Sequence, residues 1–393
     1  MTNLTDKQSA FIQNVEKRLV IQNSYPVDMK FYPLSNKFAE GAELKTPWLA
    51  SYLSHRTTFK DGSDAEFSRL LLRERGADFS DTINRFRGAL LGLAIGDALG
   101  TTLEFQERDF STVTDIVGGG VFKLNAGYWT DDTSMACCLA YSLIKSRGFN
   151  AKHLMESFSY WYRYGAFSPT GACFDVGNAT RLAIEAFLSS GNPFSGNDSP
   201  SMAGNGSLMR IAPIVLFYFD HFEDVVTYAA ESSKTTHPAV EAVDACRYFS
   251  ALLFGALSGE RKEILLSSRY SPVQGYWDKY PLSPKINSIA IGEYQTKNRD
   301  KILSTGYVVD SLEAALWAFA RHDSFRAGML EAVNLAGDSD TIGAIYGQIA
   351  GAYYGEFSLP IEWITKIYAP QGFYHFAQDL LGMRRFRGES IEE

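Results

Sequence analysis

The chain has 393 residues, of which 46% are apolar and 14% are aromatic, so it can bury one large core or two ordinary ones and is not a disordered chain. Its net charge of −8, from 37 basic and 45 acidic residues, argues against a nucleic-acid-binding surface, because phosphate contacts depend on lysine and arginine. No apolar run is long enough for a transmembrane helix or a signal peptide, and four cysteines without metal-ligand spacing favour reduced thiols in a cytoplasmic protein.

Residues 1–83 differ from the rest of the chain. A short helix is expected at about 6–20, and aromatic, turn-prone stretches follow it, without a strong apolar period before residues 66–75. We interpret this segment as an N-terminal extension, and we assign the chemistry to residues 84–393.

From about Asn84 onward, apolar residues recur every three or four positions, as on one face of a helix. Strand signals are scarce and short, so the sequence predicts an all-α fold, a compact helical domain. The long segment 259–306 is expected to contain some helix of its own, because loops of such length are rare in compact domains. Further helices are predicted at 132–147, 151–164, 177–190, 207–219, 222–233, 238–258, 308–321, 325–335 and 341–355.

Two segments carry glycine at every fourth position. Glycine inside a helix costs about 1 kcal/mol relative to alanine, so such a repeat needs a compensating gain. On a helix, a four-residue spacing makes a nearly straight ridge without side chains, and we infer two central helices that pack closely along these ridges. The glycines are Gly88, Gly92, Gly96 and Gly100 in the first segment and Gly343, Gly347, Gly351 and Gly355 in the second.

Acidic residues accompany both glycine segments. Asp97 and Glu104 share a helix face, while Thr130-Asp131-Asp132 and Asp338-Ser339-Asp340-Thr341 each stand at the start of a helical run. Each cluster taken alone is as typical of a helix cap as of a metal site. Together they offer many oxygens without histidine or cysteine, which favours hard cations such as Mg²⁺, with Mn²⁺ or Ca²⁺ as alternatives. Carboxylates that meet in a core repel one another unless cations neutralise them, so we expect two divalent ions there. Asp97 either orients a neighbouring group in the site, which we favour, or satisfies buried backbone groups.

Six motifs follow one another after residue 84. They are Gly96-Asp97-Ala98-Leu99-Gly100 leading to Glu104, Gly127-Tyr128-Trp129-Thr130-Asp131-Asp132-Thr133, Phe174-Asp175-Val176-Gly177-Asn178-Ala179-Thr180, Gly204-Asn205-Gly206-Ser207-Leu208-Met209-Arg210, Thr236-His237-Pro238 and Gly337-Asp338-Ser339-Asp340-Thr341. In this order they resemble the ADP-ribosylglycohydrolase family, and within it the dinitrogenase-reductase-activating type. The resemblance covers about residues 84–384 and does not extend to the first 80 or so.

The resemblance implies an all-α domain that holds two Mg²⁺ ions (or Mn²⁺) and removes ADP-ribose from modified protein side chains, arginine in the most similar members. By motif, Glu104 matches an acidic residue at the reacting ribose, and Asp175 and Asn178 match a substrate-side pair, with Asp175 as a candidate proton carrier. Asp131 and Asp340 complete the expected catalytic set. Carboxylates suit this reaction, because breaking an N-glycosidic bond builds positive charge on the sugar. The implied metal ligands are Thr130, Asp131, Asp132, Asp338, Asp340 and Thr341.

Substrate-binding residues are expected outside the acidic clusters. The Gly204-Asn205-Gly206-Ser207 loop matches a diphosphate-contacting loop, although a Gly-x-Gly pattern alone is more typical of a surface turn. His237 is either a substrate contact or a core histidine. Trp129 and Tyr307 either stack on adenine or on the target guanidine, or pack in the core. Arg210 is expected to pair with a carboxylate or with a phosphate.

Residues 1–83 leave two interpretations open. Some members of the family act as immunity proteins beside ADP-ribosyltransferase toxins, and an N-terminal extension in those proteins enters the toxin's active site. The position and length of the extension, though no motif in it, favour such an arm, and the alternative is a lid or packing extension of the enzyme. Three functions follow: a metal-dependent hydrolase acting on an ADP-ribosylated protein, a binding protein that occludes a toxin, or a silent ADP-ribose reader. The complete ligand set favours the hydrolase, which can coexist with the second function.

Overall fold

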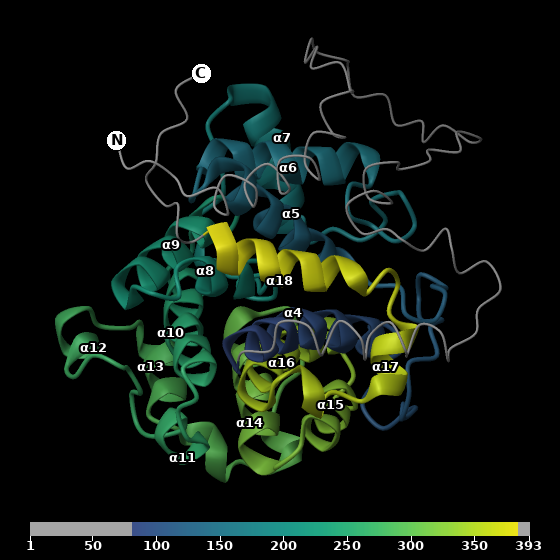
Figure 1. Ribbon diagram of the computed structural model, residues 1–393, viewed down its shortest axis with the longest axis vertical. Coiled ribbons are helices and arrows are strands. Elements are labelled where there is room, and N and C mark those ends of the chain that lie inside the picture. Colours follow the sequence, from purple (N-terminus) through teal and green to yellow (C-terminus); the bar gives the residue numbers. More distant parts are fainter. Residues whose placement is uncertain (1–80, 384–393) are drawn as a thin grey trace, which may run out of the picture.

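The computed structural model describes residues 81–383. Within this part the chain consists of α-helices, short 3-10 helices and loops, with isolated β-bridges and no strand (Figure 1). The all-α fold class predicted from the sequence is therefore confirmed for these residues. Residues 1–80, which make up most of the expected extension 1–83, and residues 384–393 lie outside the described part.

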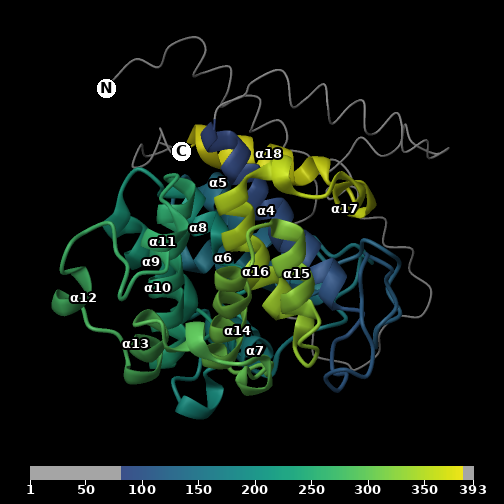
Figure 2. The same ribbon diagram turned by 90° about the horizontal axis from the view of Figure 1, so that it is seen from below.

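Two glycine-lined helices form the centre of the domain. α4 (Asp81–Gly100) and α16 (Ser339–Tyr354) lie side by side in Figures 1 and 2, and most of their residues are buried. A Cβ added to Gly92 would lie 2.2 Å from the carbonyl oxygen of Gly347, and one added to Gly347 would lie 1.9 Å from that of Gly92. No side chain larger than hydrogen fits between these backbones, so the predicted packing of the two glycine ridges is confirmed.

Other helices surround this pair, and most of their bounds match the predicted ranges to within a few residues. The segment 259–306 holds short helices, as expected. The longer helices are α5 (Asp131–Ser146), α6 (Ala151–Tyr164), α7 (Asn178–Ser190), α9 (Phe222–Lys234), α10 (Val240–Leu257), α14 (Val308–Arg321), α15 (Phe325–Val333) and α18 (Gln371–Met383). The shorter ones are η2 (Pro200–Met202), α8 (Ala212–Phe217), α11 (Lys262–Leu265), α12 (Tyr276–Lys279), α13 (Pro284–Ala290), η3 (Glu293–Thr296), η4 (Arg299–Lys301), η5 (Glu356–Ser358) and α17 (Ile361–Lys366).

The sequence-based assignment placed the start of α8 too early and missed the C-terminal helices α17 and α18. α8 begins at Ala212, and Pro213 lies in its first turn, where proline is favoured because the N–H that it lacks would have no intrahelical partner. In α18, Phe373, Phe376 and Ala377 are buried. Their spacing of three and four residues is a helix signal that the sequence already contained.

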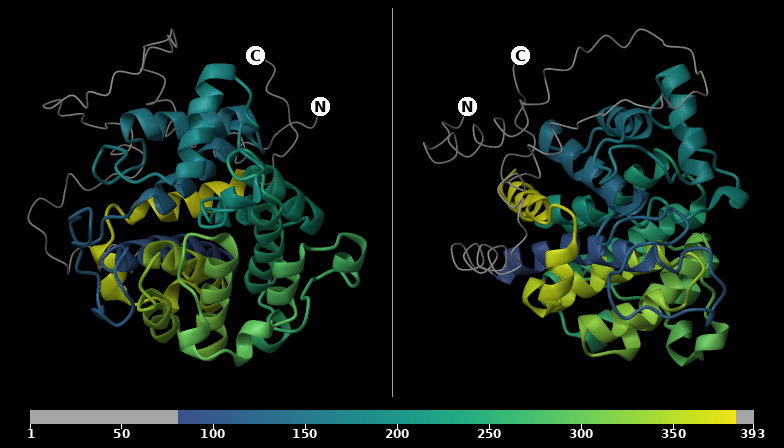
Figure 3. Two further views of the ribbon diagram at one scale, coloured as in Figure 1. Left: turned by 180° about the vertical axis from the view of Figure 1, so that it is seen from behind. Right: turned by 90° about the vertical axis from the view of Figure 1, so that its right-hand side faces the viewer.

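The surrounding helices enclose the central pair from several sides. α18 packs against α4 and α5, while α14 and α15 cover α16 on the other side (Figures 1 and 3). α5 in turn contacts α6, and α10 contacts α9. The two glycine helices are therefore shielded from solvent, and only their ends give access to a ligand.

Three segments that are far apart in the sequence converge near one end of the central pair. α4 ends at Gly100 and leads into Glu104, α5 begins at Asp131, and α16 begins at Ser339. A parallel β-bridge joins Glu104 to Gly337, the residue before the second acidic cluster. Helix ends and one short backbone pairing thus bring the acidic motifs together.

Two further observations bear on the sequence-based expectations. Within residues 81–383, no helix combines the length and the apolarity needed to cross a bilayer. None of the four cysteines is paired, and Cys137, Cys138 and Cys246 are buried. Burial raises the pKa of Cys138 well above its usual value, so this thiol stays protonated and packs as a small apolar group.

Candidate active site

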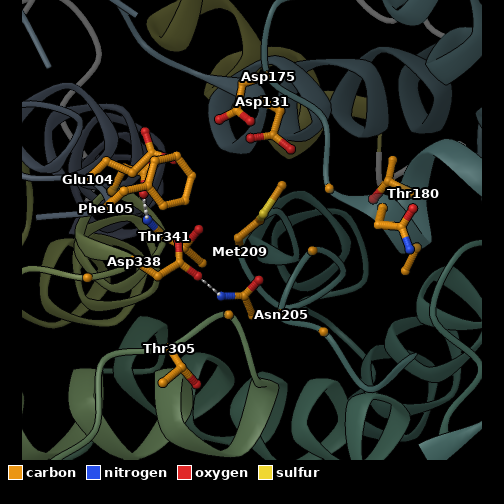
Figure 4. A pocket seen from close by; sticks show the side chains of 18 of the residues that line it. Glu104, Phe105, Asp131, Asp175, Thr180, Asn205, Met209, Thr305, Asp338 and Thr341 are labelled. Atoms are coloured by element: carbon orange, nitrogen blue, oxygen red, sulfur yellow. Dashed lines mark hydrogen bonds between the residues drawn. The ribbon is translucent and has the colours of Figure 1, made fainter. Parts of the chain in front are cut away.

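A pocket of about 520 Å³ lies where the acidic segments converge (Figure 4). Its lining comes from the loop after α4, from the N-terminal ends of α5, α7 and α16, and from the loops 204–206 and 304–306. This volume is in the range of pockets that take drug-sized ligands. The predicted site residues that line it are Glu104, Asp131, Asp175, Asn178, Gly204, Asn205, Gly206, His237, Asp338, Asp340 and Thr341.

The two acidic clusters of the sequence meet in space. Carboxylate oxygens of Glu104, Asp175 and Asp340 lie within 4.8 Å of one another. A second group with the same spacing consists of Asp97, Asp132 and Asp340. Because Asp340 belongs to both groups, the carboxylates form one continuous acidic wall.

Thr130 lies between carboxylates of both clusters. Its hydroxyl oxygen is 2.9 Å from Asp97 Oδ1, 3.1 Å from Asp132 Oδ2 and 3.2 Å from Asp340 Oδ2. A hydroxyl carries a single hydrogen, so it can donate to only one of these three oxygens at a time. The cluster therefore has more acceptors than donors, as expected of a site that a cation completes.

Asp97 fixes the first turn of α5. One of its carboxylate oxygens accepts from the Thr130 N–H at 2.8 Å, and the other accepts from the Thr133 N–H at 3.0 Å and from the Thr133 hydroxyl at 2.6 Å. Amide groups at a helix start lack intrahelical partners, and Asp97 supplies them from α4. This geometry fits the expectation that Asp97 orients a neighbouring group.

Burial and mutual repulsion hold the carboxyl groups toward their protonated forms. Burial raises the pKa of Asp97 to about 6 and that of Asp175 to about 7. Burial, and then the charges of neighbouring carboxylates, raise the pKa values of Asp131, Asp132 and Asp340 well above the usual range. Positive charge placed among these groups would remove that repulsion and restore their ionised forms.

The oxygen donors fit divalent cations. Glu104 Oε2 and Asp132 Oδ1 are buried and have no hydrogen-bond partner within residues 81–383, although an unpaired buried acceptor is costly. The residues 130–132 and 338–341 offer carboxylate and hydroxyl oxygens without nitrogen or sulfur ligands. Such a donor set suits Mg²⁺ or Mn²⁺ better than Zn²⁺.

The loop 204–206 forms another side of the pocket, and Asn205 ties it to the acidic wall. The Asn205 side-chain amide donates to Asp338 Oδ2 at 2.6 Å (Figure 4) and to the Ser311 hydroxyl at 2.8 Å. The Asn205 N–H donates to the Gly306 carbonyl at 3.1 Å. The loop is therefore held at a fixed distance from the carboxylates.

A buried arginine supports this loop from within the core. Arg210 donates to the Gly206 carbonyl at 3.0 Å and to the Thr236 hydroxyl at 2.7 Å, and its guanidinium lies 4.5 Å from the Phe158 ring centroid. The Thr236 hydroxyl is 2.8 Å from Nδ1 of His237, whose pKa burial lowers to about 3. Arg210 thus contacts backbone, hydroxyl and ring rather than a carboxylate, and from its fully buried place it positions two pocket-lining residues.

Three residues expected to bind substrate do not line the pocket. Trp129 is fully buried, and its ring packs edge-on against Phe373. Ser207 is also fully buried and accepts a hydrogen bond from Ser233. Tyr307 lies beside the pocket-lining loop, but the Lys285 ammonium lies over its ring, 4.9 Å from the centroid. The first two side chains therefore belong to the core and not to the substrate-binding surface, whereas a substrate contact of Tyr307 stays a prediction.

The pocket also contains residues that the sequence-based reasoning did not single out. Thr180 ends one of the quoted motifs, and its hydroxyl is buried without a hydrogen-bond partner within the described residues. The sequence did not identify the loop 304–306 as part of the site, because nothing in its composition distinguishes it from an ordinary turn. The lining residues that were missed include Phe105, Gln106, Thr180, Met202, Met209, Ser304, Thr305 and Gly306.

The fold and the site define an all-helical protein with a carboxylate-rich pocket at the end of two glycine-packed helices. A family model described as ADP-ribosylglycohydrolase matches residues 79–390. The chain belongs to this family, and the prediction made from the six motifs is confirmed.

Similar proteins agree with this assignment. The chain is 46% identical to an ADP-ribosylarginine hydrolase Tri1 of Pseudomonas putida (strain GB-1), covering 76% of this chain and 78% of that protein. It is 41% identical to the protein of the same name from Serratia proteamaculans (strain 568), with coverages of 77% and 81%. A solved structure titled ADP-ribosylglycohydrolase-related protein complex is 39% identical and superposes with a TM-score of 0.68, covering 78% of this chain and all of that one.

Proposed function

We propose that this protein hydrolyses the bond between ADP-ribose and the side chain of a modified arginine, with two Mg²⁺ ions as cofactors. The observation that carries the proposal is the meeting of residues 130–132 with residues 338–341 at a pocket that a glycine-rich loop also lines. The names of the two relatives described above support arginine as the modified residue.

The pocket has two chemically different ends. The loop 204–206 and the Thr180 hydroxyl supply backbone and side-chain groups that suit a diphosphate. The acidic wall suits the ribose that carries the scissile bond, because carboxylates stabilise the positive charge that develops on it. Asn205 connects the two ends through Asp338, so the distance between diphosphate and ribose is set before substrate binds.

The proposed roles follow from this orientation. Thr130, Asp131, Asp132, Asp338, Asp340 and Thr341 would hold the ions, which when bound can position ribose hydroxyls and activate water. Glu104, buried and partly unpaired, would face the reacting ribose. Asp175, whose carboxylate lies within 4.8 Å of those of Glu104 and Asp340, would transfer the proton that the leaving guanidine requires.

The test uses the full chain and an arginine-ADP-ribosylated protein, and it measures the release of ADP-ribose. We expect release with Mg²⁺, loss of release with EDTA and recovery after Mg²⁺ is restored. Asp340→Asn is expected to lower the rate by about 100-fold or more, because one side chain serves both carboxylate groups. Asp300→Asn, an exposed aspartate outside the pocket, is the matched control. Full activity in EDTA and in Asp340→Asn would refute the metal-dependent hydrolase.

A second proposed role concerns the extension 1–83. The family model begins at residue 79, so nearly all of the extension precedes the matched part. The partner-arm hypothesis predicts that the full chain binds an ADP-ribosyltransferase toxin and occludes its active site. Deleting residues 1–80 should abolish binding to the cognate transferase while hydrolysis of ADP-ribosylarginine continues. Undiminished binding by the shortened chain would favour the lid instead.

A further inference from the structure

Phe105 has an unusual combination of backbone conformation and exposure. Its φ of 59° lies in the left-handed region, which bulky side chains rarely adopt. Its side chain lines the pocket and is 68% exposed, whereas the preceding Glu104 is 4% exposed. Figure 4 shows the Phe105 ring beside Glu104 at one side of the pocket. Neither the backbone strain nor the exposed apolar ring helps the chain to fold, so both call for a functional reason.

The backbone on both sides of Phe105 is held in place. The Phe105 N–H donates to the Gly337 carbonyl at 2.7 Å, and the Gly337 N–H donates to the Gln106 carbonyl at 3.0 Å. Arg108 fastens the same loop by donating to the carbonyls of Arg299 at 2.8 Å and of Ile302 at 2.6 Å. The backbone that carries the Phe105 ring is therefore fixed relative to residues 338–341.

The position of Glu104 indicates which group of the substrate the Phe105 ring contacts. Successive α-carbons are about 3.8 Å apart, and Figure 4 shows the Phe105 ring beside Glu104, so the ring lies near the group that Glu104 faces. If Glu104 faces the reacting ribose, the next group along the substrate is the guanidinium to which that ribose is attached. A guanidinium is planar and cationic, and aromatic faces attract such groups.

We infer that Phe105 is a specificity-determining residue whose ring stacks on the guanidinium of the ADP-ribosylated arginine. This inference rests on the proposed function and adds to it a contact for the protein side of the substrate. The ring contacts the substrate only beyond the ribose, so free ADP-ribose does not use it. A substrate attached through a neutral hydroxyl group gains nothing from the ring, which favours arginine linkages over serine linkages.

The experiment compares Phe105→Leu, Phe105→Tyr and the matched control Phe110→Leu. Leucine keeps an apolar side chain but has no aromatic face, and tyrosine keeps the ring. Phe110 is 80% exposed on the same loop and does not line the pocket. For each variant, kcat and KM are measured with an arginine-ADP-ribosylated peptide, the inhibition constant is measured with free ADP-ribose, and the melting temperature checks folding.

For Phe105→Leu we expect a KM about 5- to 20-fold higher, with kcat changed less than about threefold and the inhibition constant for ADP-ribose unchanged. Phe110→Leu should behave like the wild type, and Phe105→Tyr, which keeps an aromatic face, should raise KM less than Phe105→Leu does. An unchanged KM in a folded Phe105→Leu, or an equal loss of affinity for substrate and free ADP-ribose, overturns this inference alone. A wild-type chain that releases no ADP-ribose from arginine with Mg²⁺ overturns the proposed function, and this inference with it.

Discussion

Replacing Gly347 by alanine would test the contact between α4 and α16 on which the site depends. The new Cβ would lie 1.9 Å from the Gly92 carbonyl oxygen and 2.3 Å from its carbonyl carbon. Both atoms belong to the backbone of a buried helix, so no side chain can rotate away. Because real Cβ atoms keep at least 3.0 Å from such neighbours, the helices would have to separate by about 1 Å.

The expected cost follows from two opposing effects. Overpacking a well-packed core costs about 1–3 kcal/mol, and a clash between two backbones belongs at the upper end. Alanine regains about 1 kcal/mol of helix propensity relative to glycine. The free energy of unfolding should therefore fall by about 2 kcal/mol, which lowers the melting temperature of a domain of this size by about 3 °C.

Thermal unfolding followed by circular dichroism measures this difference. Gly148→Ala is the matched control, because an added Cβ there has only the Tyr218 hydroxyl nearby, at 3.5 Å. We expect this control to match the wild type or to exceed it by about 0.4–1 kcal/mol, since alanine restricts the unfolded chain. If Gly347→Ala melts no lower than Gly148→Ala, the inferred close packing of the two helices is wrong.

Two further predictions concern the buried Arg210 and the half-buried His153. Arg210→Lys should weaken ADP-ribose binding by about tenfold in calorimetric titration, because one ammonium cannot replace the guanidinium that holds the Gly206 carbonyl and the Thr236 hydroxyl together. The control is Arg247→Lys, at an arginine outside the pocket, which should bind ADP-ribose normally. Equal affinities of the two variants would refute the supporting role of Arg210. Burial lowers the pKa of His153 from 6.5 to about 4 in the folded protein. As the pH falls, the unfolded chain therefore binds a proton at this residue before the folded protein does. The stability that neutral His153 contributes is complete above pH 6.5 and is lost as the pH falls toward 4. His153→Gln should therefore flatten the decline of the melting temperature over that interval relative to wild type, whereas the exposed His221→Gln should not; identical slopes would contradict this.

Much of the architecture follows from local sequence patterns. The spacing of apolar residues predicted most helices, and α6 has the predicted bounds 151–164. The glycine repeats predicted the central pair, because only a ridge without side chains explains glycine inside helices. The motifs also indicated the acidic wall, since carboxylates at helix starts are visible in the sequence even where their spatial meeting is not.

Other features depended on which way a side chain turns. Trp129 and Ser207 lie inside quoted motifs beside pocket-lining residues, yet both face the core. A motif fixes the order of residues along the chain, whereas packing against distant helices decides which of them reach the pocket. The sequence could not separate these cases, because an aromatic or hydroxyl side chain is compatible with either environment.

The sequence by itself determined the helical class, the glycine-to-glycine contact and the composition of the acidic wall, because these depend on residue type and on regular spacing. Only the tertiary structure decided that Arg210 supports the loop from beneath and that the exposed Phe105 ring stands beside the buried Glu104. Both arrangements depend on contacts with residues distant in the chain, of Arg210 with Thr236 and of Phe105 with Gly337, and such contacts leave no local pattern.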